Sequence, residues 1–380
     1  MTTLRVIIDD LAAASTGGMA RYTEELTRQL IATAPSGSDV AGIVSASPEP
    51  DYARLAERLP GLAGLYKSPL ARRELAAAWS HGFTRLPGGG MVHATSLLAP
   101  LHRHRAAVAG RNDQTVVTIH DAIAWTDPEL LTRRQLSWNT TMTRRAERFA
   151  DAVVASSHPV AEVLAEHFAF GDRIRVIGGA PSSRLRPGPD SAERRERLGL
   201  HGDYLLTVAG LDPRKGLQVL IAALARVPDV ALVVVGARAG DATGIAGWAH
   251  DRGVDPVRII VLDPLDDADL GAVLQGAAAF LQASRAEGFG LAVMEALGSG
   301  LPVIHSDAPA LLEVAADAGI VVPRDAENEA AEAEGYAASI REVLDDSELR
   351  TRLSIAGLDR ARAFSWRDSA EKVWQLHAEL

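Results

Sequence analysis

The sequence predicts an α/β protein built from two Rossmann-like, doubly wound domains. The chain has 380 residues, which is more than a single hydrophobic core usually holds. Short segments rich in Val and Ile alternate with helix-like stretches along both halves, a pattern typical of parallel sheets covered by helices. A turn-rich segment, residues 178–189, separates the two runs and indicates a hinge near residue 180.

Each half contains six segments that we expect to be buried strands, because they are short and mostly aliphatic. In the first half they are residues 4–8, 40–44, 91–94, 115–119, 152–155 and 174–177. In the second half they are residues 204–208, 231–235, 259–262, 278–281, 303–305 and 319–322. The resulting domains are residues 1–180 and 181–363.

The tail, residues 364–380, has the apolar spacing of an amphipathic helix. Trp366 and Trp374 are its expected anchors.

The composition excludes several classes of protein. It is 47% hydrophobic and 23% charged, as in ordinary folded domains. No run approaches the roughly 18 uncharged apolar residues of a membrane span. The start of the chain lacks the pattern of a secretory signal, so we expect a cytoplasmic protein. The absence of cysteine excludes disulfides, thiol nucleophiles and cysteine metal sites.

Charge is distributed unevenly along the chain. Residues 1–185 hold 20 Lys and Arg against 18 Asp and Glu, whereas residues 186–380 hold 19 against 31. A chance distribution of solvated faces accounts for this difference. The alternative is that basic pairs such as Arg133-Arg134 and Arg144-Arg145 contact an anionic acceptor or a membrane surface peripherally. The basic clusters are too short to indicate nucleic-acid binding.

The segment at residues 280–297 carries the clearest ligand-binding pattern. A buried strand ends near Gln282, a loop with Glu287 and two glycines follows, and a helix begins around Gly290. Such a turn lies at the carboxyl edge of a parallel sheet, and the free N–H groups of the helix favour phosphate. Glu287 and Glu295 flank it, and carboxylates accept hydrogen bonds from hydroxyls. This suggests a nucleotide sugar; the alternative is two glutamates that merely favour a helix N-terminus.

A second turn of this kind has the sequence DPRKG at residues 212–216, between a strand and a helix. Arg214 and Lys215 lie beside the start of that helix, where cations are unfavourable unless an anion is bound. The turn therefore indicates a phosphate site, although an ordinary solvated turn is the alternative.

Taken together, the motifs resemble those of the retaining glycosyltransferases of family 4, which have the two-domain GT-B architecture. Glu287 and Glu295 have the spacing of the E-x7-E motif of that family. The resemblance spans nearly the whole chain, and the motifs follow in the usual order. The other matches are GGMARY at 17–22, IHD at 119–121, DPRKG at 212–216, SDAPALLE at 306–313 and FSW at 364–366.

The resemblance implies a site for a nucleoside diphosphate sugar in the second domain. Lys215, and after it Arg214, would hold the diphosphate, while Glu287 binds hexose hydroxyls and Glu295 the ribose. The backbone at Phe289, Gly290 and Leu291 would contact the distal phosphate. No motif encodes the base, which we expect against the loops around residues 236–240 and 263–265, with Leu265 in the second. Several relatives carry a further arginine where this chain has Ala209-Gly210-Leu211, which leaves the second phosphate cation open.

The same resemblance assigns residues of the first domain. His120, and less firmly Asp121, would lie beside the donor sugar. Gly17 and Gly18 would approach the donor phosphates or the acceptor, although an ordinary turn before a helix is the alternative. His102 and His104 lack a nearby carboxylate pattern, so we expect no metal site. In such enzymes the two domains face each other across a cleft, and the last helix packs back on the first domain.

The implied activity is metal-independent transfer of a hexosyl group to an acceptor hydroxyl with retention, and no cofactor. GDP-mannose is the favoured donor by resemblance only, ahead of UDP sugars. A glycan, a lipid-linked saccharide and a small molecule all remain open as acceptors. A nucleotide-sugar epimerase of similar architecture and a non-catalytic nucleotide-sugar-binding protein are alternatives. An NAD-dependent dehydrogenase is disfavoured, because neither half has the G-x-G-x-x-G fingerprint after its first strand.

Overall fold

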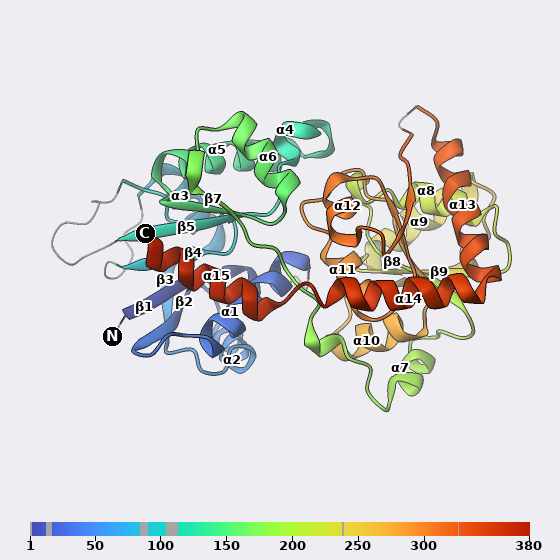
Figure 1. Ribbon diagram of the computed structural model, residues 1–380, viewed down its shortest axis with the longest axis horizontal. Coiled ribbons are helices and arrows are strands. Elements are labelled where there is room, and N and C mark those ends of the chain that lie inside the picture. Colours follow the sequence, from blue (N-terminus) through green and yellow to red (C-terminus); the bar gives the residue numbers. More distant parts are fainter. Residues whose placement is uncertain (1, 13–16, 84–89, 104–112, 238, 326) are drawn as a thin grey trace. The chain divides into compact units, whose positions relative to one another are not determined.

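The structure is a computed structural model that describes residues 2–12, 17–83, 90–103, 113–237, 239–325 and 327–380. The chain forms two compact units, residues 1–179 with 365–380, and residues 180–364. Each unit contains one sheet in which every strand pair is parallel. The predicted architecture of two parallel-sheet α/β domains is confirmed (Figure 1).

The sheet of the first unit has the strand order β3-β2-β1-β4-β5-β6-β7. Its strands are β1 (Thr2–Ile7), β2 (Ser38–Ala46), β3 (Gly64–Ala71), β4 (Met91–Ala94), β5 (Gln114–Ile119), β6 (Ala152–Ala155) and β7 (Ile174–Val176). Its helices are α1 (Gly18–Ala32), α2 (Glu49–Arg58), α3 (Arg72–His81), α4 (Ile123–Thr126), α5 (Arg133–Phe149), α6 (His158–His167) and α15 (Trp366–Glu379).

The sheet of the second unit has the order β10-β9-β8-β11-β12-β13. Its strands are β8 (Tyr204–Val208), β9 (Ala231–Val235), β10 (Ile259–Leu262), β11 (Ala279–Gln282), β12 (Val303–Ser306) and β13 (Ile320–Val322). Its helices are α7 (Ser191–Arg197), α8 (Leu217–Leu224), α9 (Ala242–Asp251), α10 (Asp267–Gly276), α11 (Leu291–Gly298), α12 (Pro309–Ala315), α13 (Glu329–Asp345) and α14 (Ser347–Ala361).

In both sheets, successive strands are added first toward one edge and then, from the middle of the sheet, toward the other edge. In the second unit the chain runs outward from β8 through β9 to β10, then returns to add β11 beside β8 and continues to β13. The loops that leave β8 and β11 therefore diverge from adjacent strand ends, which is where open α/β sheets bind ligands. The first unit has the same reversal between β1 and β4.

Buried aliphatic strands hold each unit together. The core of the second unit lies on both faces of its sheet, with Leu205, Leu232 and Leu281 on one side and Leu206, Val233 and Phe280 on the other. Successive residues of one strand point to opposite faces, so both sides must be covered by helices. This requirement explains why the strands read as continuous apolar runs.

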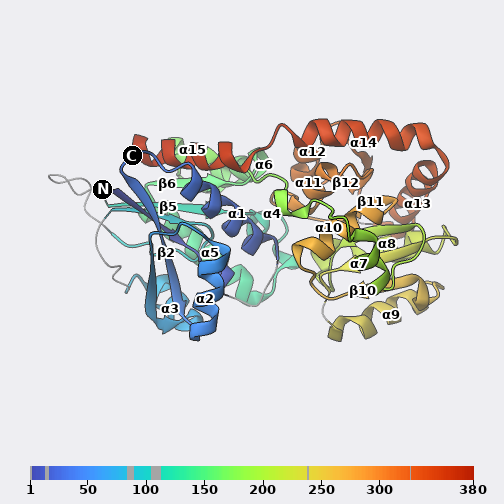
Figure 2. The ribbon, with the colours of Figure 1, turned by 90° about the horizontal axis from the view of Figure 1, so that it is seen from below.

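The last helix belongs to the first unit. Helix α15 packs against α1, and the two lie side by side in Figures 1 and 2. The indole N–H of Trp374 donates to the carbonyl of Leu30 at 3.1 Å, near the end of α1. The Ser369 hydroxyl donates to the carbonyl of Gly178 at 2.8 Å. After the second unit, the chain thus returns to the first unit, where its last helix packs on α1.

Strand β3 was not predicted. Its sequence, GLYKSPLA, contains Lys67, Ser68 and Pro69 and lacks a run of β-branched residues. It lies at the edge of the sheet and pairs only with β2, and such an edge position tolerates a proline and exposed polar side chains.

Among the described residues, no helix is both long enough and apolar enough to cross a bilayer.

Candidate active site

Two strand-to-helix junctions of the second unit meet at the carboxyl edge of its sheet. The first, Asp212–Gly216, follows β8, and the second, Ala283–Gly290, follows β11. The backbone N–H of Arg285 donates to the carbonyl of Arg214 at 2.7 Å, so the two loops are hydrogen-bonded to each other. Adjacent parallel strands bring them together, because both loops leave from neighbouring strand ends.

Gly216 allows the loops to approach this closely. It has a φ of 62°, in the left-handed region that favours glycine. A Cβ atom at this position would lie 1.9 Å from the carbonyl oxygen of Ala283. No side chain fits in that space, so the loop contact depends on the glycine.

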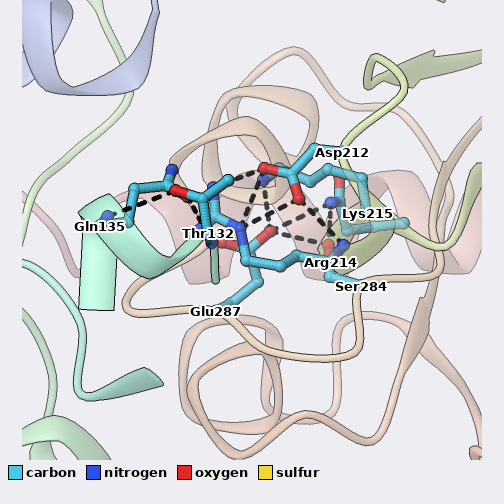
Figure 3. A network of polar contacts seen from close by, with 8 residues as sticks. Thr132, Gln135, Asp212, Arg214, Lys215, Ser284 and Glu287 are labelled. Atoms are coloured by element: carbon cyan, nitrogen blue, oxygen red, sulfur yellow. Dashed lines mark hydrogen bonds and ion pairs between the residues drawn. The ribbon is translucent and has the colours of Figure 1, made fainter. Parts of the chain in front are cut away.

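Lys215 and Glu287 form an ion pair across this contact. The Nζ of Lys215 lies 2.6 Å from Oε1 of Glu287, and the two side chains are 29% and 14% exposed (Figure 3). The same Oε1 accepts hydrogen bonds from the Ser284 hydroxyl at 2.7 Å and from the Gln282 amide at 3.2 Å. A cation and a carboxylate are therefore present together in a partly desolvated pair at the ligand-binding edge of the sheet.

Arg214 contacts the carboxylate of Asp212 in its own turn. Its Nε lies 2.9 Å, and its Nη2 2.6 Å, from Oδ2 of Asp212. Burial raises the pKa of the Asp212 carboxyl, but hydrogen bonds and charge from Arg214 outweigh burial, and the net pKa lies below its ordinary value. Asp212 also accepts from the backbone N–H of Arg214 and shapes the turn (Pro213–Lys215) that presents Lys215.

Of the remaining predicted residues of this unit, Phe289, Gly290, Leu291 and Glu295 lie in the loop and helix that follow β11, whereas Leu265 lies after β10. Gly290 precedes α11 with a φ of 92°, and a Cβ there would lie 2.5 Å from Leu311. Phe289 meets Phe364 edge to face, with ring centroids 6.0 Å apart. Leu291 begins α11, and Glu295, on its second turn, is only 6% exposed. Leu265 follows β10 and packs against the core.

In the first unit, His120 follows β5 and forms a partly buried hydrogen bond. Its Nε2 donates to the carbonyl of Thr95 at 2.7 Å, and its ring meets Tyr22 edge to face at 4.7 Å. Burial lowers the pKa of His120, and the bond to Thr95 opposes this shift only in part. The neutral ring therefore carries its proton on Nε2 and leaves Nδ1 as an acceptor. Asp121 accepts from the N–H of Ile123 at 3.2 Å, at the start of α4.

The two glycines at 17 and 18 lie at the start of α1. Gly17 is its N-cap and Gly18 its first residue, and a Cβ at Gly18 would meet no atom within 4 Å. Both glycines are exposed, and the N–H groups at the start of a helix favour an anion. The Nδ1 of His102 contacts the carbonyl of Pro100 at 2.7 Å, and His104 lies outside the described residues.

An acidic cluster in the first unit was missed. Asp9 and Asp10 lie just after β1, beyond Ile8, and are 1% and 6% exposed. The guanidinium of Arg72 contacts both carboxylates. The Oδ1 of Asp9 also accepts from the N–H of Ser45 at 2.6 Å. Two successive aspartates at the end of a buried strand were a visible signal for a cluster at the carboxyl edge of this sheet.

Comparisons with known proteins cover both units. The family described as Glycosyltransferase Family 4 matches residues 16–180, and that described as Glycosyl transferases group 1 matches residues 190–360. A D-inositol 3-phosphate glycosyltransferase of Corynebacterium glutamicum is 32% identical over 245 residues, which are 60% of this chain and 57% of that protein. The chain thus matches little more than half the length of that relative.

Two further relatives extend the comparison. An O-antigen chain mannosyltransferase B of Escherichia coli is 27% identical over 67% of this chain and 68% of its own length. The structure of Anabaena HepE in complex with UDP-glucose superimposes with a TM-score of 0.74 at 18% identity, covering 100% of both chains. At that identity the likeness concerns the fold.

Proposed function

Because the chain belongs to the GT-B glycosyltransferases of the family 4 type, we propose that it transfers a hexosyl group from a nucleoside diphosphate sugar to an acceptor hydroxyl. The observation that carries this proposal is the pair of Lys215 and Glu287 at the ends of neighbouring strands. An ammonium group matches a diphosphate, and a carboxylate 2.6 Å away matches the hydroxyls of the attached sugar.

In this proposal the second unit binds the donor. Lys215, assisted by Arg214 and the backbone at Phe289, Gly290 and Leu291, stabilises the negative charge that develops on the departing diphosphate. Glu287 accepts hydrogen bonds from the hexose. Glu295 would bind the ribose, and Leu265 would line the site of the base. Each of the two cations pairs with a carboxylate, Lys215 with Glu287 and Arg214 with Asp212. Lys215 is the first choice as phosphate ligand and Arg214 the second, as the family resemblance implies.

In the first unit, His120 and Asp121 are the residues that we propose for the donor sugar, and the helix start at Gly17 and Gly18 is proposed for the donor phosphates or the acceptor. The neutral His120 ring offers Nδ1 as an acceptor for a sugar hydroxyl, since its Nε2 proton is used by Thr95. We propose retention at the anomeric carbon, with the leaving diphosphate taking the acceptor proton. Lys215 and the helix N–H groups would supply the charge stabilisation without a metal ion.

Mannose is the proposed hexose. The O-antigen chain mannosyltransferase B relative supports it, whereas HepE was solved with UDP-glucose, so a uridine donor belongs in the same test. The name of the inositol relative makes D-inositol 3-phosphate a candidate acceptor. The exposed pair Arg133-Arg134 at the start of α5 would suit such an anionic acceptor, or a peripheral contact with anionic lipid.

A thermal-shift panel tests the donor. GDP-mannose, UDP-glucose, UDP-N-acetylglucosamine and dTDP-glucose are added to the full chain, and selective binding should raise the melting temperature for one base. The selected donor is then incubated with D-inositol 3-phosphate or a mannoside. A glycosylated product that retains the anomeric configuration, formed in the presence of EDTA, is expected. Conversion of the donor alone to an epimer would instead support an epimerase.

A further inference from the structure

We propose that Gln282 and Ser284 are positioning residues that hold the Glu287 carboxylate in the orientation that receives the donor hexose. This inference rests on the proposed function and deepens it, because it concerns the same site. Gln282 ends β11, Ser284 follows two residues later, and both side chains are buried.

The hydrogen bonds form a short relay that ends on one carboxylate oxygen. The Gln282 amide donates to the Ser284 hydroxyl, which in turn donates to Oε1 of Glu287 at 2.7 Å. The Gln282 amide also reaches that Oε1 at 3.2 Å, and Lys215 contacts the same atom. Within the described part of the chain no hydrogen bond ends on Oε2. The relay thus leaves Oε2 as the oxygen that accepts from the sugar.

Lys215 alone cannot keep the carboxylate in this orientation during the reaction. The proposed function assigns its ammonium to the diphosphate, so the ion pair must weaken when the donor binds. Ser284 and Gln282 carry no charge and have no attraction of that kind to the phosphates. They remain as the donors that prevent Glu287 from rotating with Lys215.

The backbone of the relay is itself fixed from two sides. The Tyr336 hydroxyl donates to the carbonyl of Gln282 at 3.0 Å, and the Ser306 hydroxyl donates to the carbonyl of Ser284 at 2.6 Å. Tyr336 and Ser306 are both 0% exposed. The donors of the relay therefore have little freedom to move, as accurate placement of a ligand-binding carboxylate requires.

Gln282 is an unfavourable choice for stability at this position. Its Oε1 is buried and has no hydrogen-bond partner within the described residues. A buried amide oxygen without a donor lowers stability, whereas an apolar side chain of similar shape would not. The amide N–H groups, which serve Ser284 and Glu287, are the part of the side chain that has a use here.

The test compares the affinity of a nucleotide sugar with that of its nucleoside diphosphate. Calorimetry is carried out on the full chain with GDP-mannose and GDP, and with UDP-glucose and UDP. Gln282→Met keeps the length of the side chain and removes the amide. We expect this substitution to lower the affinity for the sugar nucleotide about 10-fold relative to the affinity for the diphosphate, without lowering the melting temperature. Ser284→Ala should weaken the sugar nucleotide by at least as much.

Two controls separate positioning from general damage. Thr143→Val removes a buried hydroxyl of the first unit that has no partner among the described residues, and it should leave both affinities unchanged. In a Glu287→Gln background, Gln282→Met should have little further effect, because the relay acts only through that carboxylate.

The outcomes distinguish this inference from the proposed function. A wild-type affinity ratio in folded Gln282→Met and Ser284→Ala variants would overturn the inference alone. The inference would also be overturned if Gln282→Met changed the affinity ratio as much in the Glu287→Gln background as in the wild-type chain. If the wild-type chain binds neither these four nucleotides nor any other donor of the thermal-shift panel, the proposed function fails and the inference fails with it.

Discussion

The ammonium of Lys215 lies 2.6 Å from the carboxylate of Glu287, although 72 positions separate the two residues in the chain. They come from loops after β8 and β11, which are adjacent in the sheet but not in the sequence. Without a donor each residue neutralises the other, so a diphosphate must compete with Glu287 for Lys215.

Lys215→Ala should remove most of the transfer activity. Loss of one donor that stabilises developing negative charge costs about 2.7–4 kcal/mol of transition-state stabilisation, or roughly 10²- to 10³-fold in kcat. The fold should persist, because Lys215 is partly exposed. Lys67→Ala, which breaks an exposed ion pair with Glu49, is the matched control. Steady-state kinetics provide the measurement, and a near-normal rate would remove Lys215 from the site.

Glu287→Gln should raise the affinity for the diphosphate and lower the affinity for the sugar nucleotide relative to that for the diphosphate. The amide no longer pairs with Lys215, so the diphosphate alone should bind more tightly. The sugar nucleotide should bind less tightly relative to the diphosphate, because a charged acceptor of its hydroxyls is lost. Isothermal calorimetry measures both. A parallel change in the two affinities would contradict the assignment of Glu287 to the sugar.

Gly216→Ala should separate the two loops. The new Cβ would lie 1.9 Å from the carbonyl of Ala283, and the left-handed backbone adds about 1 kcal/mol. Gly202→Ala isolates the second effect, since Gly202 has a φ of 68° with no atom within 4 Å of the new Cβ. Donor binding should therefore fall in the first variant and persist in the second. Equal behaviour would show that the loop contact does not matter.

Trp374→Phe should destabilise the first unit. The indole N–H satisfies the carbonyl of Leu30 in the last turn of α1, where helix carbonyls lack partners within the helix. Its loss costs about 1–3 kcal/mol of unfolding free energy. Urea denaturation measures this, with Trp248→Phe in α9 of the second unit as the control. Equal losses in both variants would remove the special role of the bond.

Stability should fall in mild acid because of two buried histidines. Burial lowers the pKa of His93 to about 3 and that of His377 to about 4, with the nearby His377 adding to the first shift and Asp151 opposing the second. The rings lie 5.7 Å apart between β4 and α15. Both are neutral when folded but titrate near 6.5 when unfolded, so stability present above pH 6.5 is lost as pH falls toward 4.

Within that pH window, each of these histidines lowers the free energy of unfolding by about 1.4 kcal/mol for each pH unit of acidification. His93→Leu should therefore flatten the dependence of unfolding free energy on pH between 6.5 and 4.5. Urea melts at several pH values are the measurement. An unchanged slope would mean that other groups determine the acid sensitivity.

The sequence alone was sufficient for most of the fold. Aliphatic runs such as residues 231–235 identify buried parallel strands, since only strands covered on both faces are apolar throughout. Strand β3 was not predicted, because an edge strand needs no such aliphatic run. Arg214, Lys215 and Glu287 could be proposed as site residues because glycine turns after strands have a recognisable local pattern.

Only the tertiary structure could show which side chains meet. The ion pair of Lys215 with Glu287, the buried relay from Gln282 through Ser284, and the cluster of Asp9 and Asp10 with Arg72 all join residues through sheet order or loop geometry. Local sequence determines whether a segment becomes a strand, because backbone and burial preferences are local. The order of strands, which decides the neighbours of each loop, arises from packing among segments distant in the chain.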